Sequence, residues 1–517
     1  MNSNLTNTQS DYAVFLPALS GFYATFIGKQ RFEEYVDKTR IPLNLPNGVE
    51  SLNYLNQQAG NFYYKWTLYS AGHADLDVTK DNPNEDMVRN RNREDTWLLG
   101  DSGGFQIGKG VWEGDWKNPS CPKASKKRDD VLKWMDAYMD YGMILDVPAW
   151  VCRSKAGRDA TGITSYQEAV NATRVNNDYW LKHRTGSCKF LNVLQGEVHT
   201  EADDWYQQMK DYCDPKKYPN NHFNGWAMGG QNMCDTHLVL KRLISLRFDG
   251  LLEKGIHDVM HFLGTSKLEW AVLLTDIQRA VKKYHNENFT ITFDCASPFL
   301  ATANGQIYCD LETKDRKKWV YRMVPSIDAL RLSNDTRPFS DVFIAENKHS
   351  SFMNSPITKS LKANDICIYA RGDKNKQGEI KVYKGEYLLN KDGTNKIDPI
   401  TNQPIIAKKD STSWDSFSYA LMMGHNVWMH INAVQEANRQ YDNNVYPKML
   451  INDEFLGITQ EFKEVVNQIF ATDNRDKANE INDDYQRYLD TIIGTRGTTG
   501  KKMTNSKTGF DNLFEEV

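Results

Sequence analysis

Two aspartates in this chain each follow an apolar run, and their chemistry is the natural starting point. Asp101 opens the stretch Asp101-Ser102-Gly103-Gly104-Phe105-Gln106, directly after the predicted buried strand Thr96-Trp97-Leu98-Leu99. Asp294 follows the apolar run Thr290-Ile291-Thr292-Phe293. Paired carboxylates suit glycosidic-bond chemistry, in which one attacks or stabilises the anomeric carbon and the other transfers protons. The simpler explanation of the first stretch is a tight strand-to-helix turn, so its role depends on what the fold places beside it.

Apolar runs alternate with amphipathic helical stretches along the chain. Further strands are expected to end at Leu145, Leu194, Met228 and Leu263. The clearest helical stretches are residues 128–140, 165–184, 200–212, 236–254 and 266–285. This repeated strand–helix alternation predicts a parallel α/β fold.

Polar residues and glycines follow every predicted strand. They include Asp101, Asp146, Gln195, Gly229, Gly230, Gly264 and Asp294. In a (β/α)8 TIM barrel the carboxyl ends of all strands meet at one mouth, whereas a doubly wound sheet concentrates its site at one switch point. Six polar strand ends therefore favour the barrel.

The remaining chain divides by its residue pattern. A single core stops growing at about 250–300 residues, so a chain of 517 residues should carry further units. We expect an α/β fold: a (β/α)8 TIM barrel with an insertion and an α-helical C-terminal extension. The expected parts are N-terminal strands or a cap (1–60), the barrel core (61–310), an α+β insertion (311–411), a closing barrel helix (412–445), C-terminal helices (446–494) and a flexible basic tail (495–517).

Composition and charge narrow the class of protein. The net charge of −4 provides no overall basic field, so a nucleic-acid partner would be held by local patches. Eight scattered cysteines without a C-x-x-C pair predict reduced thiols and a cytoplasmic location. The polar amino terminus does not resemble a signal peptide, and no apolar run approaches the ~18 residues of a membrane span.

Six motifs resemble, in order, those of the tRNA-guanine transglycosylases, (β/α)8 enzymes that exchange a guanine in nucleic acid for a 7-deazaguanine. The resemblance covers residues 95–306, and His425-Asn426-Val427 is similar to part of the family's closing helix. The motifs are residues 101–106 (DSGGFQ), Asp146 after an apolar run, Val193-Leu194-Gln195-Gly196, Gly225-Trp226-Ala227-Met228-Gly229-Gly230, His261-Phe262-Leu263-Gly264, and Phe293-Asp294-Cys295 followed by Ala303-Asn304-Gly305-Gln306.

The resemblance implies a role for individual residues. Asp294 would be the nucleophile that bonds C1′ of the target nucleoside, and Asp101 would be the general acid/base. Asp146 would accept from N1–H and the exocyclic amine of guanine, while Gln195 and the Gly230 N–H would donate to O6. The full base-binding set would be Ser102, Phe105, Asp146, Gln195, Gly229, Gly230 and Leu263, with Phe105 and Leu263 on the two faces of the ring. The target nucleotide would be flipped out of any duplex. For each of these residues taken singly, the alternative to a functional role is a structural one in barrel packing or loop capping.

Two features depart from the family pattern. Cys309 and Cys367 lack the C-x-C-x-x-C spacing of the family's zinc site, so we expect no metal and no cofactor. Ser297-Pro298-Phe299 stands where the family has Pro-Thr-Arg, which removes an arginine expected near tRNA phosphates. The chain therefore looks most like the bacteriophage 7-deazaguanine DNA transglycosylases, whose product protects DNA from restriction enzymes. The resemblance implies DNA and a preQ0-like 7-deazaguanine base as partners, with tRNA as the alternative nucleic acid, and is compatible with a homodimer.

Two basic runs are candidate nucleic-acid contacts, although solvated loops explain them equally well. They are Lys126, Lys127 and Arg128, and Arg316, Lys317 and Lys318 with Trp319 and Tyr321 interleaved. His73, a lone histidine after a strand, is better explained as structural.

Three other functions stay open. They are a tRNA-guanine transglycosylase that lacks zinc, a non-catalytic nucleic-acid-binding subunit, and a phosphate- or sugar-handling barrel. The presence of both Asp101 and Asp294 argues against the second. A phosphate- or sugar-handling barrel would give Asp146 and Gln195 no joint role.

Overall fold

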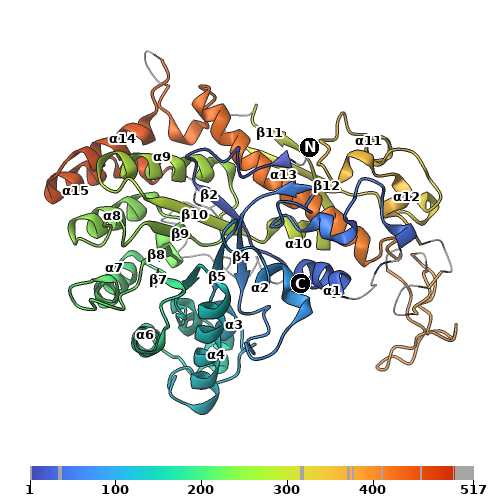
Figure 1. The fold of residues 1–517 in the computed structure, drawn as a ribbon, viewed down its shortest axis with the longest axis horizontal. Coiled ribbons are helices and arrows are strands. Elements are labelled where there is room, and N and C mark those ends of the chain that lie inside the picture. The colour runs from blue at the N-terminus through green and yellow to red at the C-terminus, as the bar shows by residue number, and fades with distance from the viewer. Residues whose placement is uncertain are drawn as a thin grey trace.

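The computed structural model is built around a sheet of eight parallel strands that curls into a barrel (Figure 1). It describes residues 3–32, 36, 38–314, 319–369, 373–374, 378–382, 384–408, 411–453, 457–492 and 494. The strand order is β2-β10-β9-β8-β7-β6-β5-β4, and the expected (β/α)8 barrel is confirmed. The strands are β2 (Val14–Pro17), β4 (Trp66–Ser70), β5 (Trp97–Asp101), β6 (Tyr141–Met143), β7 (Lys189–Leu194), β8 (Gly225–Met228), β9 (Val259–Phe262) and β10 (Thr290–Cys295).

The barrel closes at a narrow seam between β2 and β4. One parallel bridge joins Ala18 to Leu68, and the Leu19 N–H donates to the Leu68 carbonyl at 2.9 Å. Side chains add to it, because the Tyr64 hydroxyl donates to Phe15 O at 2.6 Å and the Thr67 hydroxyl to Pro17 O at 2.7 Å.

The barrel therefore begins earlier than residue 61, within the segment expected to form a cap. β2 pairs with β10 over four residues, and helix α1 (Gly21–Phe32) follows it. A run of only four strand residues followed by turn formers gives a weak periodic pattern, which is why the sequence did not mark it as a barrel strand. A separate two-residue pair, β1 (Ser3–Asn4) with β3 (Phe62–Tyr63), lies outside the barrel sheet.

Helices cover the outside of the sheet between successive strands (Figure 1). Three of them begin at side-chain caps: Ser154 accepts from Gly157 N, Ser165 from Glu168 N, and Asp235 from Leu238 N. The five long connecting helices agree with the periodic stretches of the sequence. They are α4 (Pro122–Tyr138), α6 (Tyr166–His183), α7 (His199–Met209), α8 (Thr236–Phe248) and α9 (Leu268–Tyr284), with the short helices α2 (Asp86–Arg89), α3 (Gly104–Gly108) and α5 (Lys155–Thr161) beside them.

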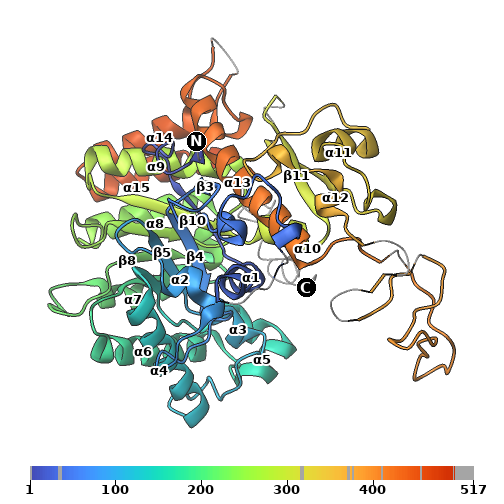
Figure 2. The same cartoon turned by 45° about the vertical axis from the view of Figure 1, so that its right-hand side comes forward.

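A second layer of helices lies over one side of the barrel (Figure 2). Helix α13 (Ser416–Asp442) and helix α14 (Glu461–Ala471) pack on α9, while α15 (Arg475–Asp484) and α16 (Gln486–Leu489) pack on α8. Because α9 is covered on both sides, several of its polar residues are buried, and Asp276 accepts from the Tyr441 hydroxyl at 2.6 Å. The C-terminal extension is therefore part of the barrel's packing.

The insertion begins after α10 (Ser297–Ala303) with an antiparallel pair, β11 (Gln306–Glu312) and β12 (Val320–Pro325), followed by α11 (Phe339–Asn347) and α12 (Ala363–Ile366). Residues 384–408 project from it as a loose arm (Figure 2). His425 and Asn426 of α13 hold this region in place: His425 Nε2 lies 2.8 Å from Tyr308 O, and Asn426 Nδ2 donates to Thr302 Oγ1 at 2.8 Å. The pair is a clamp between α13, α10 and β11.

All eight cysteines are free thiols. Among the residues with described positions, no helix is both long enough and apolar enough to span a bilayer.

Candidate active site

Asp101 and Asp294 both lie at the mouth of the barrel. Asp101 is the last residue of β5, paired in register with Ser70 of β4, and Asp294 is the next-to-last residue of β10, paired with Leu16 of β2. Both side chains are partly exposed, so they are accessible from the mouth. The fold thus brings together two carboxylates that are 193 positions apart in the chain.

Asp101 has the environment of a proton-transfer group. Burial raises the pKa of Asp101, and the negative charge of Asp294 raises it further. The Ser70 hydroxyl, which donates to Asp101 Oδ2 at 2.6 Å, and the Gly103 N–H, which donates to Oδ1 at 3.4 Å, lower that pKa. The carboxylate is thus held by oriented donors while burial favours its protonated form.

The glycine pair after Asp101 has two separate structural roles. Gly103 has φ +86°, and a Cβ there would lie 2.4 Å from Cη2 of Trp112. At Gly104 a Cβ would lie 3.0 Å from Oδ1 of Asp146. Gly103 therefore allows the turn and the indole beside it, and Gly104 allows Asp146 to approach the Asp101 loop closely.

Asp146 and Gln195 form a buried pair at the ends of neighbouring strands. Gln195 Nε2 donates to Asp146 Oδ2 at 2.8 Å, and each residue is 5% exposed. Burial raises the pKa of Asp146 to about 7, the Gln195 hydrogen bond opposes this, and the charge of Asp101 adds to it. Within the described part of the chain, Gln195 Oε1 is buried and has no hydrogen-bond partner. A buried polar atom in this state is costly unless a ligand pairs it or reorients the amide.

Gly229 and Gly230 allow two loops to cross beside Gln195. A Cβ on Gly229 would lie 3.1 Å from Gln195 Nε2, and one on Gly230, whose φ is +53°, would lie 2.4 Å from Gly196 O. Gly230 is also the first residue of the short 3-10 helix Gly230–Met233. The N–H groups of a first helical turn have no acceptor inside the helix, so the Gly230 amide suits donation to a ligand.

Asp294 is anchored through one of its two oxygens. Oδ1 accepts from the Gly264 N–H at 2.9 Å and lies 3.2 Å from His261 Nε2. His261 is fully buried, and its other ring nitrogen lies 2.9 Å from Thr292 Oγ1. The described residues provide no hydrogen bond to Oδ2. That oxygen therefore carries the lone pairs that are available for nucleophilic attack.

The remaining expected base-binding residues lie around the same mouth. Ser102 is buried next to Asp101. Phe105, on α3, is partly exposed, with its ring 6.2 Å from that of Trp150 and with Lys109 Nζ 5.6 Å from its centroid. Leu263 follows β9 and is also partly exposed. The role of Phe105 and Leu263 as two sides of a base slot stays a prediction.

The candidate nucleic-acid contacts divide into exposed and buried residues. Lys126 is exposed, with 76% of its side chain accessible, and Lys127 is half-buried. The expectation for Arg128 is wrong, because its side chain is buried and its guanidinium stacks 4.1 Å from the Tyr179 ring centroid. Helical periodicity turns Arg128 toward the barrel, which makes it a packing residue. Arg316, Lys317 and Lys318 lie outside the described residues.

The aromatic residues of the second basic run also pack inward. Trp319 is 3% exposed, and its backbone N–H donates to Glu269 Oε1 at 2.9 Å. The Tyr321 ring stacks on His430 at 4.3 Å, and its hydroxyl donates to Ser266 O at 3.0 Å. The expectation that these two rings are interleaved contacts for DNA is therefore wrong. They attach β12 to the barrel.

The zinc ligand set of the resembled family does not fit this chain. Cys309 Sγ donates to Arg322 O at 3.3 Å, Cys367 Sγ donates to Ile327 O at 3.5 Å, and burial raises the pKa of Cys309 to about 11. Zinc sites need thiolates, and buried thiols that donate to carbonyls are not prepared for this role. Within the described ranges no three His, Cys, Asp or Glu residues are grouped as metal ligands would be.

Three residues around the carboxylates were missed or assigned no role by the sequence reasoning. Ser70 and His261 bond to Asp101 and Asp294, and a serine or histidine inside an apolar strand is the pattern that could have pointed to them. His73, expected to be structural, lies close enough to Asp101 for their charges to interact, although burial lowers the pKa of His73.

Comparison of the chain with models of protein families found no match, and comparison with curated proteins found no relative.

Proposed function

We propose that this protein exchanges guanine in DNA for a 7-deazaguanine base through a covalent intermediate on Asp294. The observation that carries the proposal is the arrangement at the barrel mouth. The partly exposed Asp101, whose pKa is raised, interacts electrostatically with Asp294 and with Asp146 of the hydrogen-bonded Asp146–Gln195 pair. Two carboxylates with different environments and an adjacent buried polar pair suit the removal and replacement of a planar polar base.

In the first half-reaction, Asp294 Oδ2 attacks C1′ while the bond from C1′ to guanine N9 breaks. Anchoring of Oδ1 by Gly264 and His261 directs the free oxygen toward the sugar. Protonated Asp101 gives its proton to the departing guanine, so the base leaves neutral. The raised pKa of Asp101 makes a protonated fraction available for this step.

In the second half-reaction, the Asp101 carboxylate takes the N9–H proton of the incoming 7-deazaguanine. The released nitrogen lone pair attacks C1′, and the bond to Asp294 Oδ2 breaks with its electrons returning to the carboxylate. Each proton given in the first step is regained in the second, and two displacements retain the configuration at C1′.

Recognition of the base uses the buried pair. Asp146 accepts from N1–H and the exocyclic amine, and the Gly230 N–H and one amide hydrogen of Gln195 donate to O6. Gln195 Nε2 carries two hydrogens, of which Asp146 accepts one, so the second remains for O6. Ser102, Phe105 and Leu263 complete the slot. A mouth of this kind admits one flipped nucleotide and not a paired one.

DNA is the proposed nucleic acid because features associated with tRNA in the resembled family are missing. Cys309 and Cys367 each donate to a backbone carbonyl instead of lying among metal ligands, and Pro298 and Phe299 lie on α10 where the family has a threonine and an arginine. Modified DNA of this kind would be protected from restriction enzymes.

The deciding experiment supplies purified protein with a labelled 7-deazaguanine and either duplex DNA or tRNA. We expect label in DNA, and label only in tRNA would contradict the choice of DNA. Asp294→Asn should abolish exchange while nucleic-acid binding persists, with Asp159→Asn on α5 as the matched control at an exposed carboxylate. An active Asp294→Ala protein would refute the assignment of the nucleophile.

A further inference from the structure

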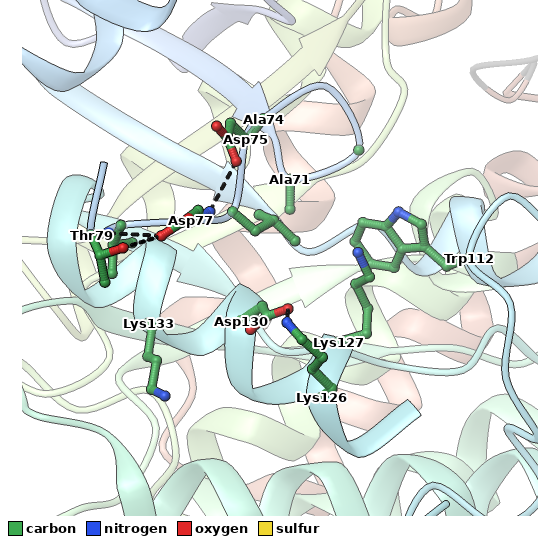
Figure 3. Close-up of a pocket in the computed structure, with 13 residues that line it drawn as sticks. Ala71, Ala74, Asp75, Asp77, Thr79, Trp112, Lys126, Lys127, Asp130 and Lys133 are labelled. Carbon is green, nitrogen blue, oxygen red and sulfur yellow. Dashed lines mark hydrogen bonds and ion pairs between the residues drawn. The ribbon is translucent and has the colours of Figure 1, made fainter. Parts of the chain in front are cut away.

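A cavity of about 560 Å³ lies beside the Asp101 loop, between the segment after β4 and helix α4 (Figure 3). Its size is in the range of small-ligand sites, about 300–1,000 Å³. One wall is the loop that follows Ser70, with small and apolar side chains such as Ala71, Ala74 and Leu76. The other wall is one face of α4, which carries Lys126, Lys127, Asp130 and Lys133.

The cavity borders the proposed reaction centre. Ala71 N–H donates to the Asp101 carbonyl at 2.9 Å, and Ser70, the preceding residue, bonds the Asp101 side chain. Trp112, which also lines the cavity, packs against Gly103 of the Asp101 loop. A ligand in the cavity therefore lies next to any nucleotide held at Asp101.

Lys127 places a half-buried positive charge in the cavity. Its Nζ lies 4.9 Å from the centre of the Trp112 ring, and the side chain is half-buried. Lys126 is paired with Asp130 and Lys133 with Asp129, each at 2.6 Å, whereas Lys127 forms no ion pair with any described residue. Burial lowers the pKa of Lys127, and the charge of Asp130, which is paired with Lys126, opposes this without forming an ion pair with Lys127.

The acidic residues of the opposite wall do not supply that countercharge. Asp75 accepts from the N–H of Asp77 at 3.1 Å and from Asn82 Nδ2 at 3.3 Å. Asp77 accepts from Thr79 through one oxygen and pairs with Lys80 at 2.8 Å through the other. Neither carboxylate forms an ion pair with Lys127, so the Lys127 ammonium is the cation of the cavity that remains available to a ligand.

We propose that this cavity binds a phosphate of the DNA strand next to the exchanged nucleotide, with Lys127 as the main contact. The inference rests on the proposed function, since it takes the strand to enter at Asp101. The phosphate supplies the missing negative charge, and the sugar attached to it packs against the apolar wall of Ala71, Ala74 and Leu76. Trp112 holds the ammonium in place from the other side.

The test measures binding of duplex DNA to Asp294→Asn protein, with and without Lys127→Gln, over a range of salt concentrations. Loss of one phosphate contact should weaken binding several-fold for every sequence tested and make the slope of log K against log salt less steep by ~0.9. Lys127→Arg should restore most of the affinity. The matched control is Lys254→Gln, because Lys254 lies between α8 and β9 at the face opposite the mouth, and it should change neither quantity.

An unchanged affinity and slope in a folded Lys127→Gln protein would overturn the proposal. So would Lys127-dependent binding of inorganic phosphate together with an unchanged DNA affinity of Lys127→Gln, since the cavity would then be a site for free phosphate only. The binding assay does not depend on base exchange. If Lys127→Gln weakens DNA binding but the wild-type protein exchanges no base, the cavity proposal stands and the proposed function is refuted. If the wild-type protein exchanges the base but Lys127→Gln leaves DNA binding unchanged, the proposed function stands and the cavity proposal is refuted.

Discussion

Replacement of Asp146 by asparagine is expected to stabilise the protein at alkaline pH while removing its capacity to bind the base. Burial raises the pKa of this carboxyl from 3.8 to about 7. An acid with a raised pKa favours folding below the pKa of the unfolded chain. It lowers the stability progressively as the pH rises toward the folded pKa, above which the loss is constant. Asparagine has the same shape and carries no charge at any pH.

The size of the effect follows from the two pKa values. Each pKa unit corresponds to ~1.4 kcal/mol, so the ionised Asp146 lowers the free energy of unfolding by ~4 kcal/mol at pH 8. At pH 5.5 the same calculation gives ~2 kcal/mol. The entropy of unfolding is ~2.1 cal/mol/K per residue, or ~1.1 kcal/mol/K for this chain, so the corresponding increases in Tm are ~4 °C at pH 8 and ~2 °C at pH 5.5.

The assay is thermal unfolding of the wild-type protein and Asp146→Asn at both pH values. The decisive quantity is the change in the Tm difference between pH 5.5 and pH 8, because it does not depend on how well asparagine packs. Asp159→Asn, at an exposed carboxylate of α5, serves as the control and should show no such change. A Tm difference that is the same at both pH values would refute the claim that burial raises the pKa of Asp146.

Three further outcomes follow from the site. Ser70→Ala should raise the pKa of Asp101 further, since the lost hydroxyl favours the carboxylate, and the limb of the pH–rate profile that Asp101 controls should move to higher pH. His261→Phe should lower kcat ~10–100-fold with little change in KM, because hydrogen bonds to charged groups contribute ~1.5–3 kcal/mol, and His261→Gln, which keeps a donor, should recover part of the rate. Full activity of His261→Phe would contradict the anchoring of Asp294. Gly103→Ala should destabilise the protein more than Gly186→Ala in thermal unfolding; both residues have a left-handed φ, but only Gly103 has Trp112 in the path of a Cβ. Equal losses in the two variants would argue against that packing.

The strand and helix pattern could be predicted from the sequence because its period repeats. Runs that end at Leu99, Leu194 and Met228 form β5, β7 and β8, and the polar residues after them converge as parallel strands require. β2 was missed because four residues before a turn give too short a pattern to distinguish a barrel strand from a loop.

The partners within the site could not be predicted in the same way. Ser70 contacts Asp101 because β4 and β5 pair in one particular register, and a shift of one residue would turn the hydroxyl to the other face. The direction of Arg128 and Tyr321 likewise depends on the element beside them. A basic or aromatic residue in a polar run says little about which side of its helix or strand it faces.

The barrel resembles a ring that is cut at one point, because few hydrogen bonds join β2 to β4. β2 is firmly paired with β10, which carries Asp294, and β4 is firmly paired with β5, which carries Asp101. One backbone bridge and a few hydroxyls join the two sides. Sheet regions crossed by few hydrogen bonds open at the lowest free-energy cost. A slight widening there would change the spacing of the two carboxylates while every other strand pair stays intact. The distance between Asp101 and Asp294 is therefore the dimension of this barrel that is easiest to adjust.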